Sequence, residues 1–260
     1  MILKRRVALN GVQLDSLDNR ILITELNEAA GKDTIGAVGL GGGNGQRITG
    51  MRRDTLDVTV KFTINIKNND MSGRSTLLDK INAWARAGGT LTVGHRSGKQ
   101  LKVVLAQAPG GGDQFAWSNE FTLLFRAYGV PFWEDTTATT KTLAQDDTGT
   151  DTITMPGSAE TVGEATIQNK SGNTLDTLSL TVNGCEMEFS DLGLANNGYL
   201  VIDHIEAGGI YVKRARIGQT SVLDKLTGAD EFILKPGDNA ISYEAGGDVI
   251  VTVSAKGRYV

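Results

Sequence analysis

The chain has 260 residues, among them 33 glycines, 4 prolines and 1 cysteine, and its formal net charge is −4. This length predicts two domains, each large enough to bury a core without disulfides or a structural metal. The single cysteine, Cys185, excludes an intramolecular disulfide and leaves too few thiolates for a cysteine-based zinc site. Abundant glycine and threonine, together with valine and isoleucine, favour short strands joined by tight turns.

The charge is distributed unevenly along the chain. Residues 1–135 contain 17 Lys+Arg and 13 Asp+Glu, a net charge of +4, whereas residues 136–260 contain 9 and 17, a net charge of −8. The asymmetry predicts two units with different surroundings, but it is too diffuse for a nucleic-acid-binding patch. The start of the chain lacks the apolar segment of a signal peptide, and no stretch approaches the roughly 20 apolar residues of a membrane span. We therefore expect folding in a reducing cytoplasm and no membrane insertion.

The first part of the chain begins with a predicted hairpin, because Asn10-Gly11 lies between apolar residues and separates the strand-like segments 6–9 and 12–14. A strand is expected at 20–25. Residues 27–50 include the run GLGGGNG, which is too flexible to pack by itself, so this segment is interpreted as a mobile arm or a long hairpin that leaves the domain.

Residues 55–67, TLDVTVKFTINIK, alternate strictly between apolar and polar, which predicts a long half-buried strand. Residues 74–87 form the one convincing helix, because their apolar residues recur at spacings of three and four. Ser72 or Ser75 is expected to cap its start, and Gly88-Gly89 to end it. Strands are predicted at 90–93, 101–106 and 120–127.

The second part of the chain loses the helical period. Residues 136–152, rich in Thr and Asp, are interpreted as a linker or an irregular lead-in between domains 1–135 and 153–260. Short strands at regular spacing then predict a β-sandwich. They are expected at 164–169, 178–183, 185–189, 199–202, 209–214, 231–234, 239–244 and 249–255, the last two separated by a turn at Gly246-Gly247.

A search for chemistry finds no catalytic constellation and no cofactor or metal motif. His95 is expected in an exposed turn, and His204 has only Asp203 and Glu206 nearby, which are too few ligands for a metal. Cys185 is interpreted as a buried structural thiol. Residues 39–45 resemble a phosphate loop only superficially, because a strand-like segment follows them where such a loop needs a helix.

The chain is therefore expected to be a binding or assembly module rather than an enzyme, with no cofactor. Three arginines, Arg47, Arg52 and Arg53, follow the glycine-rich segment. Their ordinary interpretation is the solvated start of a strand. As functional residues, they would suit ion pairs with a neighbouring subunit.

Several segments in order resemble the distal tail (Dit) protein family of long-tailed bacteriophages. The N-terminal part carries VALNGVQL, a long loop, GQRITGMRRDTLDVTVKFTINI, LLDKINAWARAGG and FTLLFRAYGVPFWED, of which the phrase at Pro131–Glu134 is the most specific. The C-terminal part carries SGNTLDTLSLTVNG, DEFILKPGDNAISYEAGG and VTVSAKGRYV. The resemblance covers essentially the whole chain, although the glycine run Gly41–Gly43 is not typical of the family.

The resemblance implies a structural protein of the siphophage tail tip, assembled in the host cytoplasm. Its N-terminal domain would be a β-sandwich-like belt domain that forms a ring of six copies, with an extended arm clasping the next subunit. Its C-terminal domain would be a galectin-like β-sandwich at the periphery. The implied partners are further copies of the chain, the tail tube protein, the tail-tip hub or tail-associated protein, and a receptor-binding protein. DNA would only pass through the channel.

Two other functions remain open from the sequence. A tail tube subunit also combines β-structure, a long loop and one helix, although such subunits generally have a single domain. A carbohydrate-binding tail adhesin would use the C-terminal domain, in which no convincing sugar site is visible.

Overall fold

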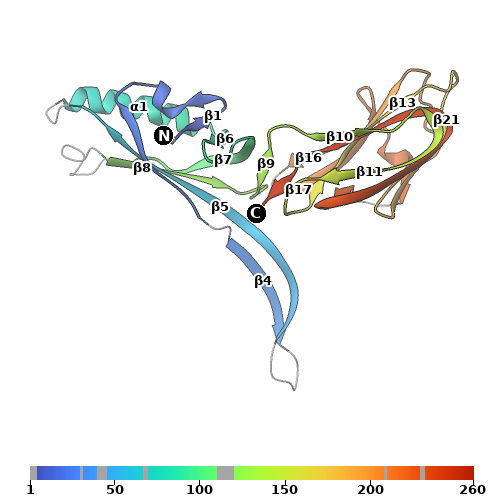
Figure 1. The fold of residues 1–260 in the computed structure, drawn as a ribbon, viewed down its shortest axis with the longest axis horizontal. Coiled ribbons are helices and arrows are strands. Elements are labelled where there is room, and N and C mark those ends of the chain that lie inside the picture. The colour runs from blue at the N-terminus through green and yellow to red at the C-terminus, as the bar shows by residue number, and fades with distance from the viewer. Residues whose placement is uncertain are drawn as a thin grey trace. The chain divides into compact units, whose positions relative to one another are not determined.

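The computed structural model describes residues 5–29, 32–39, 46–66, 70–109, 120–207, 210–228 and 232–260. The chain divides into two compact units, Met1–Trp133 and Glu134–Val260, and each is described by itself (Figure 1). The protein is mostly β, as expected: among the described residues, 61% lie in strands and there is a single α-helix.

The first unit is built on an antiparallel sheet with strand order β2-β1-β6-β7-β8-β5-β3, and β4 pairs with β5. A short 3-10 helix, Leu14–Ser16, follows β2. The strands are β1 (Val7–Leu9), β2 (Val12–Gln13), β3 (Ile21–Glu28), β4 (Lys32–Gly39), β5 (Gln46–Ile64), β6 (Gly89–Val93), β7 (Lys99–Gln107) and β8 (Glu120–Ala127).

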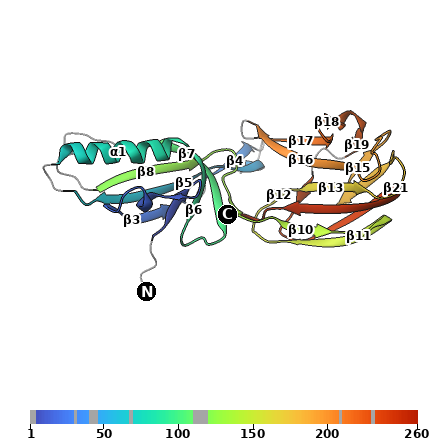
Figure 2. The same cartoon turned by 90° about the horizontal axis from the view of Figure 1, so that it is seen from above.

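Helix α1 (Met71–Arg86) covers one face of this sheet (Figure 2). Leu77, Leu78, Ile81 and Ala85 of its apolar stripe are buried as predicted. Trp84 is half-buried, and its ring meets Phe125 of β8 edge-on at 5.9 Å. The predicted serine cap is wrong. The helix begins earlier, and the carboxylate of Asp70 accepts a hydrogen bond of 2.8 Å from the Gly73 N–H, so it already occupies the N-cap position.

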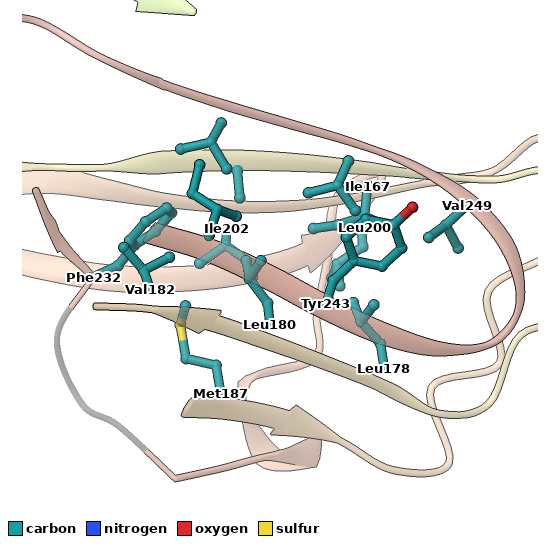
Figure 3. Packing of buried hydrophobic residues seen from close by; sticks show 14 of the residues in the cluster. Ile167, Leu178, Leu180, Val182, Met187, Leu200, Ile202, Phe232, Tyr243 and Val249 are labelled. Atoms are coloured by element: carbon teal, nitrogen blue, oxygen red, sulfur yellow. The ribbon is translucent and has the colours of Figure 1, made fainter. Parts of the chain in front are cut away.

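The second unit consists of two groups of strands that share one long strand, β21 (Gly237–Ala255). Residues 237–245 of β21 pair with β11 and β14, whereas residues 249–255 pair mainly with β10 and β13, and β11 reaches them only where Asp146 pairs with Val249. Side chains from both groups pack together into one core (Figure 3). The strands of the first group are β11 (Asp146–Met155), β14 (Leu178–Val182), β15 (Cys185–Phe189) and β19 (Leu226–Gly228). Those of the second are β10 (Thr139–Thr142), β13 (Glu164–Asn169), β16 (Tyr199–Ala207), β17 (Ile210–Ile217) and β18 (Thr220–Ser221).

Smaller elements complete the second unit. Strand β12 (Thr161–Val162) pairs with β20 (Ile233–Leu234), and a 3-10 helix spans Leu223–Lys225. Strand β9 (Trp133–Asp135) begins at the last residue of the first unit and pairs with β22 (Arg258–Tyr259).

The turn expected at Gly246-Gly247 is absent, because β21 continues through both glycines. A Cβ atom at Gly246 would lie 2.8 Å from the Thr177 hydroxyl oxygen, and one at Gly247 would lie 2.7 Å from the Ser171 Cβ. Neither glycine has a positive φ. These glycines therefore permit the close approach of another segment to a bending strand and do not form a turn.

The segment 136–152, expected to be a linker or an irregular lead-in, instead contains β10 and most of β11, both paired with β21. Few of its side chains are buried, which explains its polar composition. Threonine suits such exposed strands because its β-branched side chain favours extended backbone.

The prediction that Cys185 is buried is wrong, because its thiol is exposed. Cys185 alternates in phase with the buried Met187 and Phe189 of β15. It lies, however, at the very start of that strand, directly after the Asn183-Gly184 turn and beyond the core.

Candidate assembly surface

Strand β5 continues well past the sheet to which it belongs. Its second half is fixed, because residues 58–64 pair with β3 on one side and residues 56–63 with β8 on the other. The apolar side chains of this half are all buried: Leu56, Val58, Val60, Phe62 and Ile64. The strict alternation seen in the sequence thus marks the part of β5 that lies inside the first unit.

Among the described residues, the first half of β5, residues 46–55, pairs with β4 alone. We call residues 32–39 and 46–55 the ribbon. Figure 1 shows that the ribbon extends away from the rest of the first unit. Its described side chains at 34–37 are all exposed, and Ile35 is 54% exposed. A two-stranded ribbon without a third strand or a packed face is marginally stable in water, so it is suited to pairing with another surface.

The predicted arm at 27–50 therefore contains an ordered hairpin, while the glycine run Gly41–Gly43 lies outside the described residues. The pairing of β4 with β5 has register shifts next to Lys32 and next to Gly36. Each shift places one extra residue on β5, which bends and twists the ribbon locally.

The ribbon is basic in sequence. Its described residues carry four positive and two negative side chains, a net charge of +2: Lys32, Arg47, Arg52 and Arg53 against Asp33 and Asp54. The Thr34 hydroxyl donates a hydrogen bond to the Asp54 carboxylate across the two strands. This contact joins β4 to β5 close to the body of the unit.

The three candidate arginines all lie on β5 within the ribbon. In the β4–β5 register, Arg47 is opposite Val38, Arg52 opposite Thr34 and Arg53 opposite Asp33. The Arg53 guanidinium lies over the Phe132 ring, 5.5 Å from its centroid. Arg53 therefore has an intrachain contact near the root of the ribbon, while Arg47 lies toward the far end.

The root of the ribbon is held by Glu28, the last residue of β3. Its carboxylate accepts hydrogen bonds from Arg96 Nε at 2.6 Å and from the His95 ring at 2.5 Å. The Arg96 guanidinium also stacks on the fully buried Trp133 ring at 5.2 Å. The turn between β6 and β7 thus fixes the point where β3 ends and the ribbon begins. His95 is half exposed in this turn, as expected, but it is not free of contacts.

A second ion pair lies on the other side of β5. Both guanidinium nitrogens Nε and Nη2 of Arg126 donate to the Asp57 carboxylate, each at 2.6 Å. This charge-assisted pair raises the pKa of Arg126 above its ordinary value. Arg126 also stacks on Tyr128, whose side chain is 56% exposed. The strands on both sides of β5 are thus held by ion pairs at the point where the ribbon begins.

The remaining titratable residues form no reactive site. The His204 ring lies 3.1 Å from the Gly163 carbonyl, and burial lowers the pKa of this histidine. The neighbouring Asp203 carboxylate accepts hydrogen bonds from Arg214 and Arg216. Across the described residues, no three His, Cys, Asp or Glu side chains are grouped to hold a metal. None of the described helices is long and apolar enough to cross a membrane.

The sequence predicts an arm or long hairpin here, but it does not predict the contacts that hold the root of the ribbon. Glu28 and Arg96 are 68 positions apart, and Asp57 and Arg126 are 69 apart. No local spacing or motif indicates such pairs, because they depend on strand register within the sheet.

The fold was compared with solved structures. The Dit protein (gp 19.1) of phage SPP1, described as a paradigm of the hub adsorption apparatus in phages that infect Gram-positive bacteria, matches with a TM-score of 0.71. The alignment covers 97% of this chain and 98% of that chain at 14% sequence identity. Two structures of the phage p2 baseplate in its activated conformation, with Sr and with Ca, cover 98% of this chain and 99% of theirs. They match at 8% identity, with TM-scores of 0.45 and 0.46.

In sequence, no protein-family model and no curated protein matches the chain. TM-scores below 0.5 do not establish a common fold, so the SPP1 match carries the comparison. The alignment with SPP1 Dit spans both units, and it confirms the fold that the motifs, in their order along the chain, predict. The chain is thus Dit-like in its structure.

Proposed function

We propose that the protein is a non-enzymatic structural subunit of a bacteriophage tail tip, and that copies of it assemble into a ring through the ribbon. The fold shared with SPP1 Dit supports the tail-tip role. The observation that carries the assembly is the ribbon itself, an exposed two-stranded extension on a braced body. A heterologous ring requires a projecting surface on each copy and a different receiving surface on the next.

The finer features of this proposal follow the family resemblance. The ring would have six copies, connect the tail tube to the tail-tip hub, and line the passage through which DNA leaves. The first unit would form the ring, and the second would be its galectin-like periphery. Arg47, Arg52 and Arg53 would contact the neighbouring copy, because their sequence places a net positive charge on the ribbon.

The test is a shortened ribbon. Ile35 and Met51 lie opposite each other in the register, so residues 36–50 can be replaced by an Asn-Gly turn that joins them directly. Size-exclusion chromatography with light scattering should give about 166 kDa for the full chain, six times 27.6 kDa, and close to one chain for the shortened variant.

Both units should remain folded in the shortened variant, because every pair of β5 with β3 and β8 is retained. Calorimetry of the variant provides that control. A full chain that stays monomeric at high concentration, or a shortened variant that assembles as the full chain does, would contradict the proposal.

A further inference from the structure

The two groups of strands in the second unit differ in the side chains that they turn away from the core. On β14, β15 and the first part of β21, these side chains are small or acidic: Ser179, Thr181, Glu186, Glu188, Ser242 and Glu244. The large apolar side chains that are exposed on the described strands of this unit all lie on β16 and β17: Tyr199, Ile205 and Val212. Tyrosine is enriched where proteins bind their partners, so the outward face of β16 and β17 is the candidate binding surface.

The register of three strands places polar side chains around Tyr199. Strands β13, β16 and β17 lie side by side (Figure 2). Tyr199 of β16 is opposite Gln168 of β13, and two residues further along β16, Val201 is opposite Arg216 of β17. Diagonal neighbours in an antiparallel pair lie about 7–8 Å apart, so Gln168, Tyr199 and Arg216 border an area comparable to one six-membered sugar ring.

The Tyr199 ring is open to a ligand. The side chain is 51% exposed. Because Leu200 is opposite Ile217, the neighbour of Tyr199 on the β17 side is Gly218, which has no side chain. A Cβ atom at Gly218 would have no heavy atom within 4 Å. The ring therefore has free space beside it, and its apolar face suits the C–H groups of a flat ligand ring.

The charged part of this surface is held in place by its own hydrogen bonds. Arg214 donates from Nε and Nη2 to the two oxygens of the Asp203 carboxylate at 2.8 and 2.7 Å, and Arg216 donates from Nη2 at 3.1 Å. Asp203 is buried, whereas the side chains of Arg214 and Arg216 keep exposures of 41% and 34%. The Nε of Arg216 has no hydrogen-bond partner. Arg216 thus retains N–H donors for an acceptor that comes from outside.

The charges on this face balance, which indicates the class of ligand. Glu164 precedes Ala165, the residue opposite Ile202, and its charge acts on Arg214. Glu164 and Asp203 together offset Arg214 and Arg216, so a phosphate or another strongly anionic ligand gains little here. Arginine donors beside an amide and an exposed aromatic ring match a neutral sugar, whose hydroxyl oxygens accept hydrogen bonds and whose C–H face is apolar.

We propose that the outward face of β13, β16 and β17 binds a neutral pyranose unit of a polysaccharide, which stacks on Tyr199 and accepts hydrogen bonds from Arg216. This inference goes beyond the proposed ring function and does not depend on it. An exposed sheet face buries only part of a ligand, so a single sugar should bind with a Kd of about 1 mM. Several copies held together would bind a polysaccharide more tightly through avidity.

A glycan array probed with the full chain identifies the sugar, and saturation-transfer NMR with its methyl glycoside, up to about 10 mM, measures the affinity. Tyr199→Ala should weaken binding at least about tenfold, because it removes the stacking surface. The matched control is Tyr199→Phe, which keeps the ring and should bind within about twofold of the unmodified protein. Arg216→Lys should also weaken binding, because lysine keeps the charge and loses the planar set of donors.

Two controls separate binding from folding. Thr181→Ala lies on the outward face of the other group of strands and should leave binding unchanged. Calorimetry should show that the Tyr199 and Arg216 variants keep the melting temperature of the second unit, and Gln168→Ala replaces any variant that does not. Failure of every neutral glycan to bind would overturn the inference, as would equal binding by folded Tyr199→Ala and Tyr199→Phe. Binding that requires a sialylated or sulfated glycan would overturn the neutral class of ligand.

Discussion

Phe232 belongs to the buried core of the second unit, and its truncation is expected to lower the melting temperature of that unit alone. The side chain is 1% exposed, and it packs so closely on Gly163 that a Cβ atom there would lie 2.8 Å from the ring. Because this backbone contact is already tight, the surrounding core has little freedom to fill a cavity. Phe232→Ala should therefore cost about 3–5 kcal/mol, the usual range for a buried phenylalanine.

The expected shift in melting temperature follows from the size of the unit. Glu134–Val260 contains 127 residues, 260 minus 133. At about 2.1 cal/mol/K per residue, its unfolding entropy is about 0.27 kcal/mol/K, so the second unit should melt roughly 11–19 °C lower. Phe62→Ala is the counterpart in the first unit, because Phe62 is fully buried there.

Differential scanning calorimetry of the two variants separates the units. Each substitution should lower the melting temperature of its own unit by about this amount. The melting temperature of the other unit should change by no more than about 2 °C, because distant substitutions rarely change the free energy of unfolding by more than 0.5 kcal/mol. A single transition in the unmodified protein, or a common shift of both transitions in either variant, would refute the division into independently stable units.

Two further predictions concern the second unit. Burial raises the pKa of Asp203, but the hydrogen bonds from Arg214 and Arg216 outweigh it, so the folded pKa lies below the ordinary value of about 3.9. The ionised Asp203 carboxylate therefore stabilises the fold above pH ~4, and this contribution is lost as the pH falls through the folded pKa. Urea titrations should show that Asp203→Asn lowers the free energy of unfolding at pH 7 and does so progressively less at pH 4 and below. An equal destabilisation at every pH would contradict this origin. Gly247→Ala should cost about 1–3 kcal/mol through its clash with the Ser171 Cβ, and Ser171→Gly should restore most of that loss. No recovery in the double variant would show that the clash is not the cause.

The sequence predicted those elements whose pattern reflects a single buried face. The alternation at 55–67 located the buried half of β5, and the apolar stripe at 74–87 located α1. The first half of β5 has no such pattern, because it lies outside the body and has no buried face to impose a period of two. The same reason explains why the exposed strands β10 and β11 were interpreted as a linker.

Other errors came from residues whose role depends on distant neighbours. Gly246-Gly247 is consistent with both a turn and a close approach, and only the position of Ser171 and Thr177 decides between them. In the candidate site, Arg47, Arg52 and Arg53 stand out in the sequence because they follow the glycine-rich segment, and their contact with a neighbouring copy stays a prediction. The pairing of Glu28 with Arg96 could not be found, because it depends on how the β6–β7 turn reaches the end of β3.

The single strand shared by both layers of the second unit has a consequence for the order of folding. Each layer obtains a central strand from β21, and those residues, 237–255, are synthesised about one hundred positions after the unit begins at Glu134. Neither layer can be completed on the ribosome before that segment emerges, whereas the first unit is fully translated by Trp133. A nascent chain is therefore expected to display a finished first unit, ribbon included, while its second unit is still incomplete.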